Sequence, residues 1–254
     1  MSIEIKAKVR EVREIGYTIL PGHLPRTLME ECNNAFAPIL SKHMDEIDNH
    51  PNRGPRRHYI SLPLVPPFYD PRIFADETIV AIVAGLLGED MAIAQYATDT
   101  PLSRSVYQAV HADVGNLFPE EWTIYPPTLI AVNFPFVDVG PQHGPIEVSR
   151  GTHMLEKEEA VAKINAGDIA LEPLFMQAGD VLIRDPRGLH RGSPNRTEIP
   201  RVVAVIGCQR AWRQRNDEHD QTPIPRSQWD GMSNGERKRL RYFETLVETG
   251  EYKS

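Results

Sequence analysis

The chain has 254 residues, of which 41% are hydrophobic and 25% are charged, which is an ordinary globular composition. Its 28 basic and 35 acidic residues give a net charge of −7, and this argues against nucleic-acid binding, because phosphate contacts need clustered Lys and Arg. The first residues carry charges throughout and contain no signal-peptide core, and no apolar run approaches the roughly 18 residues of a membrane span. The two cysteines, Cys32 and Cys208, do not make a disulfide framework. We therefore predict a single-domain cytoplasmic protein with no nucleic-acid or membrane partner.

Residues 1–90 are predicted to form a mixed N-terminal part with two main helices. Apolar residues recur at helical spacing between 25 and 47, although Pro38 should kink or break this helix. Prolines are frequent in the segment 51–72, which predicts a long irregular loop. The expected elements are a strand at 16–21, a helix at 25–47, this loop, and a helix from Asp76 to Leu87 that ends at Gly88.

Residues 91–210 are predicted to be mostly strands, because short apolar runs alternate here with Gly and Pro turns. The expected strands are 91–98, 105–111, 128–137, 144–149, 180–184 and 201–208, with a surface helix at 155–166 between them. A C-terminal helical extension, 211–254, contains a helix at 233–248 with Ser233 as its N-cap. This pattern predicts a mainly β domain with flanking helices, either a sandwich or a barrel.

Two His-x-Asp motifs are candidate metal sites, and geometry separates them. His43 and Asp45 fall on the predicted first helix, where residues i and i+2 point about 200° apart and cannot bind one ion. His111 and Asp113 come at the end of a predicted strand, where residues i and i+2 share a face and can reach one metal. We therefore expect His111 and Asp113 to be metal ligands, and His43 and Asp45 to form a solvated helix end.

Two further residues can complete a site with His111 and Asp113. His190 follows a short apolar strand and is the candidate third ligand. Arg201 opens another apolar strand, a position that suits a guanidinium only where it meets an anion, and its planar fork matches a carboxylate. Two histidines and one carboxylate leave positions on the metal open, and this set is typical of non-haem Fe(II) oxygenases.

The order and spacing of these residues resemble the phytanoyl-CoA dioxygenase family. The resemblance covers residues 16–209 and includes the opening GYTILPG, His111-x-Asp113, the block GPIEVSRGTH at 144–153, and His190 with Arg201 eleven residues later. This family consists of Fe(II)- and 2-oxoglutarate-dependent oxygenases on a double-stranded β-helix, a cupin-like jelly roll. The resemblance therefore implies this fold, with Fe(II), the cosubstrate 2-oxoglutarate and O2.

The resemblance implies that His111, Asp113 and His190 bind the iron and that Arg201 binds the distal carboxylate of 2-oxoglutarate. Relatives that halogenate replace the carboxylate ligand, whereas this chain keeps Asp113, so the expected reaction hydroxylates a C–H bond and releases succinate and CO2. Desaturation, ring formation and demethylation are alternative outcomes. The expected substrate is a free small molecule, such as a natural-product intermediate or a modified amino acid, and the expected oligomeric state is a monomer or homodimer.

Two more cosubstrate contacts follow from the resemblance. Gln108 matches a position that binds the cosubstrate in some relatives. The family often has a serine two residues after the distal histidine, whereas this chain has Gly192 there and its hydroxyl at Ser193. Ser193 is therefore the candidate for this second contact.

Several residues allow other interpretations. His190 could be a buried structural histidine, and His153 could be the ligand in its place. His143 with Glu147 imitates a metal pair, although we interpret His143 as a loop residue near the pocket rim. Arg201 could pair with an acidic residue such as Asp185 instead of a ligand.

Two other function classes remain open. A cupin-type metalloenzyme that does not use 2-oxoglutarate would not need Arg201, and a non-catalytic member of the family would bind a small molecule or a protein partner. The Pro-rich loop could cover the site, and its cations indicate an acidic or polar substrate. The residues concerned are Arg56, Arg57, His58 and Tyr59, in a loop that also holds Arg53.

Overall fold

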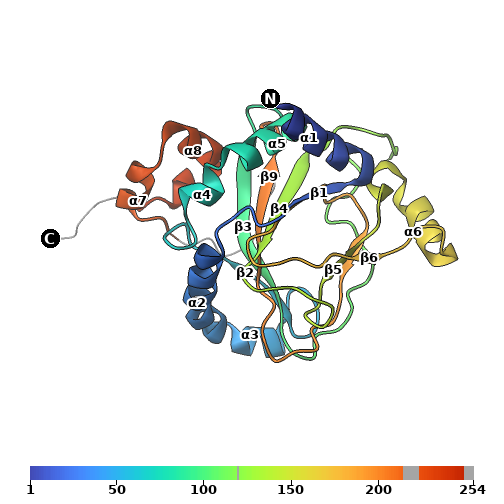
Figure 1. Ribbon diagram of the computed structural model, residues 1–254, viewed down its shortest axis with the longest axis horizontal. Helices are drawn as coiled ribbons and strands as arrows, with labels where there is room; N and C mark the ends of the chain where they lie inside the picture. The colour runs from blue at the N-terminus through green and yellow to red at the C-terminus, as the bar shows by residue number, and fades with distance from the viewer. Residues whose placement is uncertain (119, 214–222, 249–254) are drawn as a thin grey trace.

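Two antiparallel sheets form the centre of the computed structural model, which describes residues 1–118, 120–213 and 223–248 (Figure 1). The larger sheet has the strand order β1-β7-β4-β9-β3-β2, and the smaller has the order β6-β5-β8. The strands of the larger sheet, in that order, are Tyr17–Leu20, Val181–Arg184, Leu129–Pro135, Val203–Gln209, Ala92–Pro101 and Arg57–Ser61. Those of the smaller sheet are Glu172–Pro173, Ile146–Val148 and His190–Gly192. The predicted mainly β jelly roll with flanking helices is confirmed.

Side chains of the central strands point alternately to the two faces of the larger sheet. One face packs against the helices, and the other faces the interior between the two sheets. On β4, Ile130 and Val132 belong to the large apolar core that includes the helices, whereas Ala131 and Asn133 line a pocket. The neighbouring strand β9 alternates in the same way. Because successive side chains of a strand point to opposite faces, each central strand supports the helices on one face and lines the pocket on the other.

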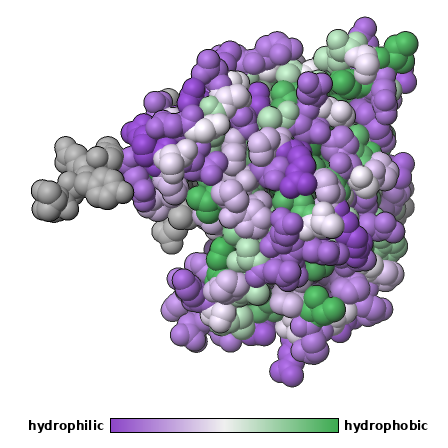
Figure 2. Space-filling view, turned by 60° about the vertical axis from the view of Figure 1, so that its left-hand side comes forward, coloured by the Kyte–Doolittle hydropathy of each residue, from purple (hydrophilic) through white to green (hydrophobic). Residues whose placement is uncertain are grey.

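Helices pack against the outer face of the larger sheet. α1 (Ile3–Ile15) lies beside α5 (Glu77–Leu87) at the top of Figure 1, and α2 (Arg26–Lys42) and α3 (Met44–Asn49) lie at the lower left. The other described helical segments are α4 (Pro71–Phe74), η1 (Thr152–Met154), α6 (Lys157–Ala166), α7 (Arg226–Gly231), α8 (Asn234–Arg239) and η2 (Arg241–Leu246). Over the described ranges, no helix has the length and apolar character that crossing a membrane requires. The face shown in Figure 2 is mostly hydrophilic, with apolar side chains in small separate patches.

Helix ends follow the capping residues that the sequence indicates. The Asp76 side chain accepts a hydrogen bond from the backbone N–H of Ile79, and α5 ends at Gly88, whose φ is 97°. Ser233 caps α8 and forms a capping box with Glu236. The predicted C-terminal helix is nevertheless divided, because η2 follows α8 as a separate 3-10 segment.

Two strand and loop predictions are wrong. The supposed irregular loop at 51–72 contains β2, which pairs with β3 from Arg57 opposite Pro101 to Ser61 opposite Ala97, and α4 begins at its end. Pairing with a distant strand overrides the local proline signal there. Conversely, the supposed strand at 105–111 is irregular, and within it only His111 forms a β-bridge, to His190.

Two expectations about the N-terminal helices also need correction. Pro38 does not break α2, which is continuous from Arg26 to Lys42. Pro38 and Asn34, whose carbonyl loses its usual N–H donor, are both exposed, so water can satisfy that carbonyl. The first residues, for which no element was predicted, form α1 with Ser2 as its N-cap.

Candidate metal centre and pocket

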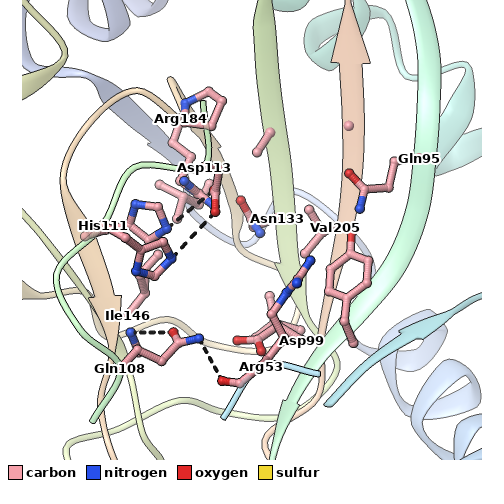
Figure 3. Close-up of a pocket in the computed structure, with 18 of the residues that line it drawn as sticks. Arg53, Gln95, Asp99, Gln108, His111, Asp113, Asn133, Ile146, Arg184 and Val205 are labelled. Carbon is pink, nitrogen blue, oxygen red and sulfur yellow. Dashed lines mark hydrogen bonds and ion pairs between the residues drawn. The ribbon is translucent and has the colours of Figure 1, made fainter. Parts of the chain in front are cut away.

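The structure brings His111, Asp113 and His190 together, although only His190 lies on a strand. His190 begins β8, and His111 faces it across a bridge in which each backbone N–H donates to the other residue's carbonyl at 2.9 Å. The backbone N–H of Asp113 donates to the carbonyl of Pro186 at 2.9 Å. These backbone bonds, and not a regular strand at 111–113, explain why the three side chains meet in the pocket (Figure 3).

The geometry of this metal triad, His111, Asp113 and His190, suits a metal ion. Nε2 of His111 lies 3.6 Å from Oδ1 of Asp113, and Nε2 of His190 lies 3.4 Å from Oδ2. Ligands about 2.1 Å from a metal and at right angles to each other would be about 3 Å apart, so only small movements are needed. Each imidazole has its Nδ1 on a backbone carbonyl, Ala109 at 2.8 Å and Gly188 at 2.9 Å. Nδ1 must therefore carry the proton, which leaves both Nε2 lone pairs free for the metal.

Arg184 completes the surroundings of the triad. It ends β7 and donates from Nη2 to Oδ2 of Asp113 at 2.8 Å. Burial alone would raise the pKa of Asp113, but its interactions with Arg184 and with His190 outweigh burial and hold this pKa well below its usual range. Burial, and then the nearby His190, lower the pKa of His111. A carboxylate and a neutral imidazole are the protonation states that metal ligands require.

Across the pocket from the triad, Arg201 meets an aspartate of β3. Nη2 of Arg201 and Nη1 of Arg57 each donate to Oδ2 of Asp99 at 3.0 Å. Figure 3 shows Asp99 on the side of the pocket opposite Asp113. Arg201 therefore does pair with an acidic residue, but that residue is not Asp185, which instead binds Arg187.

Gln108 lines the pocket and Ser193 follows the pocket-lining Gly192, and the side-chain polar atoms of both are hydrogen-bonded within the protein. The Gln108 amide accepts from the backbone N–H of Gly192 at 2.9 Å and donates to the carbonyl of Arg53 at 3.1 Å (Figure 3). The Ser193 hydroxyl donates to the carbonyl of Pro145 at 2.7 Å. In this arrangement Gln108 joins β8 to the loop that carries Arg53, and its role as a cosubstrate contact stays a prediction, as does that of Ser193.

The alternative ligands lie elsewhere. His153 is buried with Nε2 3.0 Å from the carbonyl of Arg13, and His143 accepts from the backbone N–H of Gly140. Glu147 forms an ion pair with Arg191 instead of joining His143.

The cations of the Pro-rich segment separate into different environments. Arg56 pairs with Asp48, and Arg57 is buried against Asp99. Arg53 lines the pocket, with its guanidinium 4.7 Å from the centre of the Tyr59 ring. Arg53 is therefore the arginine of this segment that a substrate in the pocket can meet.

His43, Glu46 and His58 form a second group of potential metal ligands, here called the surface cluster. Nδ1 of His43 is 2.7 Å from Oε2 of Glu46, and Nε2 of His58 is 3.7 Å from the same oxygen. Asp45 is not part of it, and His43 lies between the helices as the C-cap of α2 and the N-cap of α3 rather than within the predicted helix 25–47. The missed partner is Glu46, three residues after His43, a spacing that places two side chains on one face.

Asp99 and Arg184 were not identified from the sequence, and Arg57 was identified only as a cation of the Pro-rich loop. Asp99, Arg184 and Arg57 are charged residues in largely buried strands, and for Arg184 the strand is also apolar, which is the signal that singled out Arg201. Arg57 was hidden further because β2 was not predicted.

Comparisons with known proteins agree with this geometry. The phytanoyl-CoA dioxygenase (PhyH) family matches residues 12–203 of the chain. Among solved structures, the non-haem α-ketoglutarate-dependent epimerase SnoN from nogalamycin biosynthesis is 19% identical, with a TM-score of 0.64 over 82% of this chain and 83% of SnoN. The carbocyclase SnoK from the same biosynthesis is 20% identical, with a TM-score of 0.64 over 83% and 85% of the two chains. HygX from Streptomyces hygroscopicus, solved with nickel, 2-oxoglutarate and hygromycin B, is 17% identical, with a TM-score of 0.58 over 84% and 88%. At these identities the structures support the fold.

Proposed function

Because the chain belongs to the phytanoyl-CoA dioxygenase family, we propose that His111, Asp113 and His190 bind Fe(II) and that Arg201 binds the distal carboxylate of 2-oxoglutarate. Members of this family are Fe(II)- and 2-oxoglutarate-dependent oxygenases that use O2, and this chain is one of them. The observation that carries the residue assignment is the pair of hydrogen bonds from Nδ1 of each histidine to a backbone carbonyl. They fix the tautomer that presents both Nε2 atoms to one ion beside Asp113.

The chain's own residues hold the reactants in place. Iron, O2 and 2-oxoglutarate supply the oxidising chemistry, with release of succinate and CO2. Arg184 keeps Asp113 ionised and oriented, and apolar side chains of β4 and β9 line the pocket beside the triad. With Asp113 present as a third protein ligand, hydroxylation of a C–H bond is the proposed outcome.

The proposed substrate is a small molecule with a polar or acidic group, such as a natural-product intermediate or a modified amino acid. Arg53 supports this choice because its guanidinium lines the pocket above Tyr59. A panel of such compounds can be screened by substrate-dependent succinate release. Arg53→Met should raise the KM for an acidic substrate and leave the KM for the cosubstrate nearly unchanged.

The reaction class is tested without knowing the substrate. Fe(II) and then 2-oxoglutarate are added anaerobically to metal-free protein, and the visible metal-to-ligand charge-transfer band is recorded. We expect a band in the wild type, no band in His190→Ala, and a band in Arg201→Ala only at much higher 2-oxoglutarate. Folded, iron-loaded protein without a band would point to a cupin-type enzyme that does not use 2-oxoglutarate. Folded protein that binds no iron would point to a non-catalytic family member.

A further inference from the structure

Three charged side chains at the large sheet form a group that the proposed roles do not fully explain. Its two arginines are buried, and its aspartate side chain is 28% exposed. This charge cluster consists of Arg57 on β2, Asp99 on β3 and Arg201 just before β9. Both guanidiniums donate to the same oxygen, Oδ2 of Asp99, at 3.0 Å. Arg57 is 1% exposed and Arg201 is 3% exposed, so water screens neither charge.

The charge cluster carries one positive charge in excess. Burial would raise the pKa of Asp99, but Arg57 and Arg201 hold it below its usual range, so Asp99 is ionised at neutral pH. Burial lowers the pKa of Arg201 to about 10, which still leaves this guanidinium charged at neutral pH. Two cations and one anion therefore leave a net charge of +1, and an uncompensated buried charge is unfavourable until another anion arrives.

Arg57 is fixed on its other side by β8. Its Nη2 donates to the carbonyl of Ser193 at 2.8 Å. A Cβ atom at Gly192 would lie 2.4 Å from Nη1 and 2.5 Å from Cζ of Arg57, so a larger residue at 192 would displace this guanidinium. Arg57 itself does not line the pocket, whereas Asp99 and Arg201 do.

We propose that Arg57 is a positioning residue that neutralises Asp99 and so leaves the charge of Arg201 available for the distal carboxylate of 2-oxoglutarate. This proposal rests on the cosubstrate role of Arg201 given above. Without Arg57, Asp99 would neutralise Arg201 and repel the incoming carboxylate. Gly192 is part of this arrangement, because its lack of a side chain leaves the space that the Arg57 guanidinium occupies.

The test is an anaerobic titration of iron-loaded protein with 2-oxoglutarate, read by the charge-transfer band and repeated by calorimetry with Mn(II) in place of iron. Arg57→Met should raise the dissociation constant for 2-oxoglutarate at least tenfold. The double variant Arg57→Met/Asp99→Asn should recover most of this loss, because it removes both charges of the Arg57–Asp99 pair and restores the net charge of +1. Arg56→Met is the matched control, since the neighbouring Arg56 binds Asp48 outside the pocket, and it should bind 2-oxoglutarate like the wild type.

Titration with a second ligand distinguishes loss of the charge that binds the distal carboxylate from general disruption of the site. 2-Oxobutyrate has the same metal-binding end as 2-oxoglutarate but no distal carboxylate, so its affinity should be the same in Arg57→Met and in the wild type. Equal weakening of both ligands, or no rescue by Asp99→Asn, would overturn the proposal and leave Arg57 a purely structural role.

If Arg57→Met does not fold, Gly192→Ala takes its place and should raise the dissociation constant for 2-oxoglutarate but not for 2-oxobutyrate. Wild-type affinity for 2-oxoglutarate in that variant would also overturn the proposal. A wild type that binds iron but no 2-oxoglutarate would instead contradict the proposed function.

Discussion

The metal triad and the surface cluster each combine two histidines with one carboxylate, but the groups that face their ring nitrogens differ. In the triad, Nδ1 of both histidines meets a carbonyl oxygen, which can only accept a hydrogen bond, so Nδ1 carries the proton. In the surface cluster, the backbone N–H of Asn52 lies 3.4 Å from Nδ1 of His58, and the Asn52 side-chain nitrogen lies 3.3 Å from its Nε2. A metal on Nε2 needs a protonated Nδ1, and the Asn52 N–H donor disfavours that proton. The same ligand types therefore predict a metal site only where the outer hydrogen bonds select the correct tautomer.

The largest expected effect of this difference is on metal binding. A divalent metal at 100 times its dissociation constant should stabilise the wild type by about 2.7 kcal/mol, a rise in Tm of about 5–10 °C. His111→Ala should lose this shift, whereas His58→Ala should keep it, because only the triad is arranged to bind the ion. Thermal unfolding with and without Mn(II), together with metal content after dialysis, measures both. Two metal ions per wild-type chain, falling to one in His58→Ala, would show that the surface cluster binds metal as well.

A smaller effect is expected from Arg184, which touches the triad without being a ligand. Arg184→Met removes the 2.8 Å hydrogen bond to Oδ2 of Asp113. Loss of such an outer partner typically weakens metal affinity or activity by about 10–100-fold. Glu46→Gln removes a carboxylate from the surface cluster and should leave iron affinity unchanged. Competition for Fe(II) with a chromophoric chelator compares the two variants, and equal affinities would mean that Arg184 does not orient Asp113.

The triad could be read from the sequence because its spacing and flanking motif are local. His190, Arg201 and the His111-x-Asp113 motif are each short signals, and their order along the chain points to one family. Short apolar runs between Gly and Pro turns mark strands and predict a sandwich or barrel, and the jelly roll followed from the family resemblance.

The charge cluster, and the hydrogen bonds from the triad histidines to backbone carbonyls, could not be predicted from local sequence motifs. Asp99 meets Arg57 only because β2 pairs with β3, and β2 lies in a segment whose prolines indicate a loop. The acceptors of the two Nδ1 atoms are backbone carbonyls, whose positions depend on the path of the chain and not on residue type. The motif therefore identifies the candidate metal ligands, whereas the groups around them depend on which distant strands pair and on the path of the backbone.

The smallest expected effect concerns the pH dependence of stability at His58. Burial lowers the pKa of His58; Glu46 opposes this change, and His43 and Arg53 add to it. Below the ordinary histidine value of 6.5 the unfolded chain takes up a proton that the native His58 does not, so the free energy of unfolding falls as the pH drops through this range. His58→Gln should flatten this fall, because it removes the imidazole that the unfolded chain protonates and the native chain does not. Urea unfolding of metal-free protein at pH 7.5 and pH 5.5 measures the difference. Equal losses in His58→Gln and the wild type would show that the native surface cluster accepts the proton at His58, with Glu46 as its counter-ion.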